Sequence, residues 1–125
     1  MAETIFGVLS GYDSVVEVGV GRRPELAGRL AEAGVSVVAT DVVERELPSG
    51  VEFVLDDVTD PERAVYEGAD AIYAQRLPPE LQRPLVDLAT SIDAACYFTT
   101  LGGDPAVVPV TPLTVASGTV FVARD

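Results

Sequence analysis

The sequence predicts a three-layer α/β fold with a mostly parallel β-sheet and a C-terminal hairpin. Segments rich in β-branched residues alternate with segments whose apolar residues have helical spacing, and two short strands around a Ser-Gly turn end the chain. Hydrophobic residues make up 48% of the 125 residues, which is enough for a core and suits one domain over residues 1–125.

The first part of the chain predicts a helix, a strand and a second helix. Apolar residues at helical spacing predict a short helix over 3–10. The β-branched segment 14–18 is bounded by turn residues and predicts a buried strand. The turn 19–23 then leads into a helix over 24–34, with proline at its first position and glycine at its end.

The middle of the chain continues this alternation with shorter connections. A strand over 35–40 ends in Asp41, and the stretch 44–50 is predicted to be irregular or weakly helical. A third strand covers 51–55. Because the sequence Asp-Pro-Glu places a capping residue before a proline, a brief helix is predicted over 61–67 with proline at its first position.

The last part of the chain predicts two more strands of the parallel sheet and the hairpin. A strand over 69–74 precedes a longer helix over 80–93, in which Pro84 must lie in the first turn unless the helix is kinked or begins later. A fifth strand covers 94–101, and the segment 115–123 turns at Ser-Gly to form the terminal hairpin.

Composition and charge argue against several classes of protein. The chain has 20 acidic residues and 8 basic residues, all arginine, so direct nucleic-acid binding, which needs clustered lysine and arginine, is disfavoured. With no histidine and one cysteine, zinc sites, Ser-His-Asp or Cys-His catalysis and disulfides are also disfavoured. No segment resembles a targeting or membrane-spanning element, and we expect a cytoplasmic protein.

The acidic, lysine-free composition is typical of haloarchaeal proteins, in which surface carboxylates retain water and salt. An acidic protein from a GC-rich genome is the alternative, because codon usage there replaces lysine with arginine. We expect the free energy of unfolding to be higher in molar potassium chloride than in dilute buffer. Denaturant titrations at both salt concentrations measure this difference, and equal stability contradicts the halophilic interpretation.

Polar residues and glycines follow the predicted strands at one edge of the sheet. In open α/β sheets, ligands bind beyond the carboxyl ends of the strands. We therefore predict a ligand site at this edge, without assigning catalytic residues. Its candidate residues are Glu17, Gly19, Gly21, Asp41, Asp56, Asp57 and Arg76.

The turn Gly19-Val20-Gly21 can bring backbone N–H groups close to a ligand, although such turns also serve strand-to-helix packing. A dinucleotide fingerprint requires a third glycine three residues after Gly21, where the chain has Pro24. NAD and FAD are therefore disfavoured. A Walker-type phosphate site is excluded, because the chain has no Gly-Lys-Ser/Thr sequence.

Carboxylates end the second and third predicted strands. Asp41 lies about twenty residues after the glycine turn, where a carboxylate can accept the ribose hydroxyls of a nucleoside. Asp57, beside Asp56, can accept from an exocyclic adenine amine, or the pair can serve turn and capping chemistry. A hard-metal site that includes Asp41 is a further alternative.

The segment Gln75-Arg76-Leu77-Pro78-Pro79 follows the fourth predicted strand. The planar guanidinium of Arg76 can clamp a carboxylate or phosphate of a cofactor or of a second ligand. The alternative is an ion pair with Glu17, Asp57 or Asp104 that balances an acidic rim.

The series Val16-Glu17-Val18-Gly19-Val20-Gly21, Asp41 and Asp57 resembles the first three motifs of Rossmann-like S-adenosylmethionine-dependent methyltransferases, over roughly residues 14–75. The resemblance implies that Glu17, Gly19 and Gly21 surround the methionine portion of S-adenosylmethionine. It also implies that Asp41 contacts the ribose and Asp57 the adenine.

A fuller pattern extends this resemblance over nearly the whole chain. The pattern adds Ala69-Asp70-Ala71-Ile72-Tyr73, Arg76, Pro78-Pro79-Glu80-Leu81 and Leu101-Gly102-Gly103. With these segments the chain is similar to a small archaeal group, Uncharacterised Protein Family 0146. This resemblance implies the fold and implies no particular reaction.

The chain departs from working methyltransferases after the fourth predicted strand. It has the proline pair of an Asn/Asp-Pro-Pro-aromatic motif without the preceding amide or acid and without the aromatic residue. Our first hypothesis is a protein that binds S-adenosylmethionine or a related adenine nucleoside, with methyl transfer left open. The second is a non-catalytic scaffold, sensor or partner subunit, acting as a homodimer or with a protein partner. An NAD-linked oxidoreductase is the third.

Overall fold

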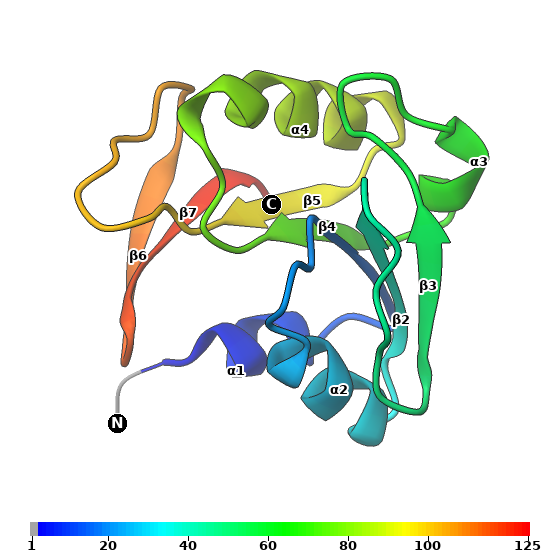
Figure 1. Cartoon of the computed structure of the whole chain (residues 1–125). Helices are drawn as coiled ribbons and strands as arrows, with labels where there is room; N and C mark the ends of the chain where they lie inside the picture. The colour runs from blue at the N-terminus through cyan, green and yellow to red at the C-terminus, as the bar shows by residue number, and fades with distance from the viewer. Residues whose placement is uncertain (1–2) are drawn as a thin grey trace.

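A computed structural model describes residues 3–125 and has one seven-stranded sheet between two layers of helices (Figure 1). The strand order is β3-β2-β1-β4-β5-β7-β6. The strands are β1 (Ser14–Val18), β2 (Ser36–Asp41), β3 (Val51–Leu55), β4 (Ala71–Ala74), β5 (Ala95–Phe98), β6 (Thr111–Val115) and β7 (Gly118–Arg124).

The pairing of the strands confirms the predicted sheet. Strands β1 to β5 pair with one another in parallel, whereas β7 is antiparallel to both β5 and β6. The predicted C-terminal hairpin is thus present as β6 and β7. This mostly parallel sheet with helices on both faces is a Rossmann-like architecture.

Two helices cover each face of the sheet, as Figure 1 shows. Helices α1 (Ile5–Leu9) and α2 (Glu25–Glu32) lie on one face, and α3 (Arg63–Tyr66) and α4 (Pro79–Ser91) lie on the other. Over residues 3–125, none of the helices has the length and apolar character needed to cross a membrane.

Alternation along the strands divides the core into two halves. Successive strand residues point to opposite faces, so Ala71 and Tyr73 of β4 pack toward α1 and α2 while Ile72 packs toward α3 and α4. Leu30 fills the first half and Leu85 the second, and both are fully buried. The parallel strands therefore carry apolar residues on both faces, as expected for a sheet covered on both sides.

Two of the predicted helix starts are wrong. Pro24 is the N-cap residue of α2 rather than its first helical residue. Pro61 lies outside α3, because Glu62 has an extended backbone (φ −77°, ψ 100°) and the helix begins at Arg63. The N–H of Glu62 donates to Asp56 Oδ1 at 3.0 Å, which holds this residue outside the helix.

Two of the three alternatives for Pro84, a position in the first turn and a helix that begins later, are wrong. Helix α4 begins at Pro79, one residue earlier than predicted rather than later, and Pro84 lies inside it, in the second turn. A proline there leaves the carbonyl of Glu80 without its helical N–H donor. Glu80 is exposed, so water can take the place of that donor.

Candidate ligand-binding site

The glycine turn after β1 needs glycine for its backbone conformation rather than for packing. Gly19 and Gly21 have φ angles of +69° and +59°. The N–H groups of Gly19 and Val20 both donate to the Thr40 carbonyl, at 2.9 and 3.0 Å, so the turn is attached to the end of β2. A Cβ atom on Gly19 would meet no atom within 4 Å, and one on Gly21 would meet only the Gly19 carbonyl oxygen at 3.9 Å. The turn therefore borders open space.

Gly19→Ala is expected to cost about 1 kcal/mol of unfolding free energy, because alanine is strained at positive φ. Gly34→Ala is the matched control for strain: Gly34 follows α2 with φ +93° and has no atom within 4 Å of its Cβ position. Denaturant titrations should give similar losses for both variants. A much larger loss for Gly19→Ala alone contradicts the open space at the turn.

Asp41 joins the end of β2 to the glycine turn. Its Oδ2 accepts from the Gly21 N–H at 2.8 Å, and its Oδ1 accepts from the Val42 N–H at 2.7 Å. The Nε of Arg45 donates to Oδ2 at 3.3 Å, which is the longest of these three contacts. Asp41 is only 9% exposed, so its carboxylate is largely buried in the turn and has protein partners on both oxygens.

Glu17 lies beneath the site rather than in it. The strand register places Glu17 beside Tyr73, whose hydroxyl donates to Oε1 at 2.8 Å, and Gln75 Nε2 donates to Oε2 at 3.0 Å. Glu17 is fully buried. Burial raises the pKa of this carboxyl from 4.5 to about 7 against the lowering effect of the two hydrogen bonds, and the nearby Glu25 adds to the rise.

Asp56 and Asp57 bond the segment that follows β3, from Thr59 to Tyr66 of α3. Asp56 accepts from the Glu62 N–H and from the Tyr66 hydroxyl. Asp57 Oδ1 accepts from the hydroxyl and the N–H of Thr59, at 2.7 and 2.9 Å, and these bonds hold the pKa of Asp57 below its usual value. These contacts are the turn and capping chemistry that the sequence allowed as the alternative. Within residues 3–125, no three His, Cys, Asp or Glu side chains are grouped to hold a metal ion.

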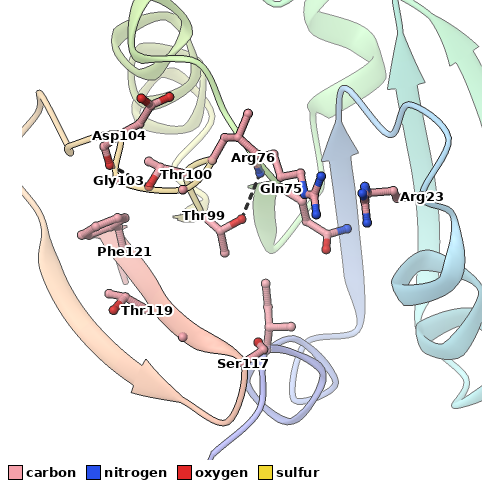
Figure 2. Close-up of a pocket in the computed structure, with 14 residues that line it drawn as sticks. Arg23, Gln75, Arg76, Thr99, Thr100, Gly103, Asp104, Ser117, Thr119 and Phe121 are labelled. Atoms are coloured by element: carbon pink, nitrogen blue, oxygen red, sulfur yellow. Dashed lines mark hydrogen bonds between the residues drawn. The ribbon is translucent and has the colours of Figure 1, made fainter.

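Two cavities meet at the carboxyl edge of the sheet. The first, of about 500 Å³, lies over the glycine turn, and the second, of about 660 Å³, lies between the ends of β4 and β5 and the β6–β7 hairpin (Figure 2). The first cavity includes the predicted site residues Gly19, Gly21 and Arg76 in its lining but not Asp41, Asp56 or Asp57. Both cavities are lined by Arg23, Gln75 and Arg76.

Arg76 has an unusual backbone and a free side chain. Its φ is +54°, and its N–H donates to Thr99 Oγ1 at 2.9 Å. The residue is exposed. The ion pairs in the described part of the chain are Arg45–Asp41, Arg63–Glu67 and Arg124–Asp93, so the ion pair of Arg76 with Glu17, Asp57 or Asp104 that the sequence suggested is not formed.

Sequence reasoning missed Arg23 and Gln82, and it placed Gln75 after the fourth strand without naming it as a site residue. Gln82 is fully buried; its Nε2 donates to the Pro105 carbonyl at 3.0 Å and its Oε1 accepts from the Val107 N–H at 2.6 Å. These bonds attach the loop after β5, which borders the larger cavity, to α4. A signal was available, because Gln82 lies three residues before Leu85 on the buried stripe of α4, where a polar residue needs partners.

Solved structures share this fold. Fibrillarin from Aeropyrum pernix, in complex with S-adenosyl-L-methionine, matches with a TM-score of 0.64 and 13% identity over 94% of this chain and 71% of that chain. An RNA methyltransferase from Salinibacter ruber, in complex with S-adenosyl-L-homocysteine, matches with a TM-score of 0.62 and 14% identity over 96% of this chain and 88% of that chain. At these identities the likeness shows the fold alone.

The sequence comparisons are more specific. A UPF0146 protein from Halobacterium salinarum is 61% identical over 123 residues, which are 98% of this chain and 95% of that protein. The sequence profile of the Uncharacterised protein family (UPF0146) matches residues 2–125. The resemblance that the motifs predicted is thus confirmed, and the chain belongs to the family UPF0146.

Proposed function

We propose that this protein binds S-adenosylmethionine or a related adenine nucleoside at the carboxyl edge of its sheet. The observation that supports this most is the glycine turn, which has positive φ at both glycines, faces open space and is bonded to Asp41. Backbone that lacks Cβ atoms lets a ligand approach closely. The likeness of the fold to proteins solved with S-adenosylmethionine or S-adenosylhomocysteine supports the same ligand class.

Each part of such a ligand has a matching surface. The methionine portion fits the 500 Å³ cavity over Gly19 and Gly21. The ribose hydroxyls fit Asp41, which can exchange its 3.3 Å contact with Arg45 for a hydroxyl donor. Val42 and Leu55, at the ends of β2 and β3, provide an apolar surface for the base, because each is 63% exposed. Burying these side chains under a flat base is favourable.

Methyl transfer to an acceptor in the adjoining 660 Å³ cavity is the activity that this binding mode permits. The alternative is a non-catalytic scaffold, sensor or partner subunit. One observation favours it: both carboxylate oxygens of Asp41 already accept N–H groups of the protein, so the turn is complete without a ligand. A scaffold of this kind acts as a homodimer or with a protein partner.

We also propose that the protein works in the cytoplasm of a halophile. The net charge of −12 and the absence of lysine support adaptation to a cytoplasm of high salt concentration. Cys96 is free and buried, which suits a reducing compartment.

Calorimetric titration in molar potassium chloride tests the ligand, with S-adenosylmethionine, S-adenosylhomocysteine, NAD and ATP as probes. We expect micromolar binding of the first two. Asp41→Asn should weaken this binding at least tenfold, because it removes the charge that ribose hydroxyls prefer. Asp87→Asn is the matched control, since Asp87 is exposed on α4 and outside both cavities at the sheet edge.

The glycine variants separate the turn from general strain. Gly19→Ala should weaken S-adenosylmethionine binding tenfold or more by filling the open space, whereas Gly34→Ala should leave it unchanged. Binding of none of the four probes contradicts the proposal and favours the scaffold. Binding of NAD alone identifies a dinucleotide site instead.

A further inference from the structure

The arginines of this acidic chain are not distributed evenly. Carboxylates pair with Arg45, Arg63 and Arg124, and Arg29 stacks on the Phe6 ring at 4.2 Å. Besides Arg29, four arginines in residues 3–125 have no carboxylate at ion-pair distance, although the chain has 20 acidic residues. They are Arg22, Arg23, Arg76 and Arg83, and the first three line the cavity over the glycine turn.

Two of these arginines also line the larger cavity. Arg23 lies between the glycine turn and α2, and Arg76 follows β4, which is paired with β1. Figure 2 shows their guanidinium groups turned toward the same space beside the Gln75 side chain. Two guanidinium groups that face one another repel, and an anion between them removes this repulsion.

The buried carboxylate of Glu17 does not neutralise the pair, and Glu25, which lines the cavity over the glycine turn, forms no ion pair with either arginine. Glu17 directs its oxygens to the Tyr73 hydroxyl and to Gln75 Nε2, and it is fully buried on the α1–α2 side of the sheet. Gln75 therefore separates Glu17 from the arginines. Its amide is bonded to Glu17 and also lines both cavities.

The backbone of Arg76 supports a role for its side chain. A φ of +54° is uncommon for a residue other than glycine and costs about 1 kcal/mol. The bond from the Arg76 N–H to Thr99 Oγ1 holds this conformation. A glycine at this position would form the same turn without the strain. The strain of an arginine here is therefore best explained by a role for its guanidinium group.

The remaining wall of the larger cavity suits an organic molecule. Thr100, Ser117 and Thr119 supply hydroxyl groups, and Phe121 supplies an aromatic face. Figure 2 shows Asp104 at the end of the cavity away from Arg23. The volume, about 660 Å³, is within the range of small-molecule sites.

We propose that this larger cavity binds a small organic oxyanion, a carboxylate or a phosphate, whose anionic group lies between Arg23 and Arg76 and whose body packs against Phe121. Binding of the anion does not depend on the proposed nucleoside site. The identification of this molecule as a methyl acceptor rests on the proposed function, because it requires a methyl donor in the adjoining cavity.

Titration calorimetry at constant potassium chloride tests the oxyanion site, with phenyl phosphate, benzoate and neutral benzyl alcohol as probes. At least one of the two anions should bind ten times more tightly than benzyl alcohol, and their ranking distinguishes phosphate from carboxylate. Arg23→Gln and Arg76→Gln should each weaken binding of that anion tenfold or more. Arg83→Gln removes the same charge from an exposed arginine outside both cavities and should leave binding unchanged.

Arg76→Gly gives a second readout at the same position. It should weaken anion binding as Arg76→Gln does while leaving the midpoint of thermal unfolding unchanged or raised, since glycine relieves the strain. Loss of binding with a lowered midpoint in both Arg76 variants points to a structural role and overturns the assignment.

Competition with S-adenosylmethionine separates the two proposals. Simultaneous binding of the anion and S-adenosylmethionine supports the oxyanion site beside the nucleoside site. In another outcome, S-adenosylmethionine displaces the anion but 5′-methylthioadenosine, which lacks the carboxylate, does not. The arginines then hold the cofactor carboxylate, and the inference is overturned.

Anion binding without S-adenosylmethionine binding contradicts the proposed function alone. Equal binding of benzyl alcohol, or equal weakening by Arg83→Gln, overturns the oxyanion site alone.

Discussion

Between pH 4.5 and pH 7, the protein should lose about 3 kcal/mol of unfolding free energy through Glu17, and Glu17→Gln should remove this loss. The cause is the burial of the carboxyl among Tyr73, Gln75 and the strands, which raises its pKa from 4.5 to about 7. Glu17 is fully buried, so solvent screening does not reduce the effect.

The sign follows from the proton balance. Between the two pKa values, the unfolded chain has released the Glu17 proton while the folded chain keeps it. The contribution of Glu17 to stability is therefore complete below pH 4.5 and is lost as the pH rises toward 7. A carboxylate with a lowered pKa has the opposite dependence.

Urea titrations from pH 4.5 to pH 8 measure this dependence for the wild type and for Glu17→Gln. The difference between the two stability curves isolates Glu17, because the remaining carboxylates are common to both proteins. Glu52→Gln is the matched control, since Glu52 is exposed on β3 and should leave the pH dependence unchanged. Parallel curves for the wild type and Glu17→Gln would show that Glu17 ionises normally in the folded protein.

Gln82→Ala should lower the unfolding free energy by about 3 kcal/mol and loosen the wall of the larger cavity. The side chain is fully buried and bonds both the Pro105 carbonyl and the Val107 N–H. Its removal leaves a cavity under the loop and frees two backbone groups. Gln82→Met keeps the volume and removes only the hydrogen bonds, so we expect a smaller loss of about 1–2 kcal/mol.

Amide hydrogen exchange at Val107 tests the cause directly. Val107 is 56% exposed, so its N–H should owe its protection to the 2.6 Å bond to Gln82 Oε1. Exchange at this amide should accelerate in Gln82→Ala and in Gln82→Met. Asp87→Ala, an exposed change on the same helix, should affect neither exchange nor stability by more than about 0.5 kcal/mol. Unchanged exchange in Gln82→Met would mean that the loop is held by other contacts.

Local patterns in the sequence were sufficient to predict the architecture and the edge of the sheet at which the candidate site lies. Strand and helix periodicities are local properties of the chain, so the alternation of elements and the terminal hairpin were predictable. The carboxyl ends of parallel strands meet at one edge, which explains why Gly19, Gly21 and Asp41 could be placed together before any contact was known.

The hydrogen-bond partners of the polar residues, in contrast, became known only from the packed fold. The turn contacts of Asp56 and Asp57 and the buried position of Glu17 depend on neighbours that no local pattern names. Pro61 lies outside α3 because Asp56 bonds the following N–H, a contact between residues six apart in sequence. Arg23 and Arg76 line the same cavity because they follow β1 and β4, which are adjacent in the sheet. The order of strands in a sheet is a property of the packed molecule.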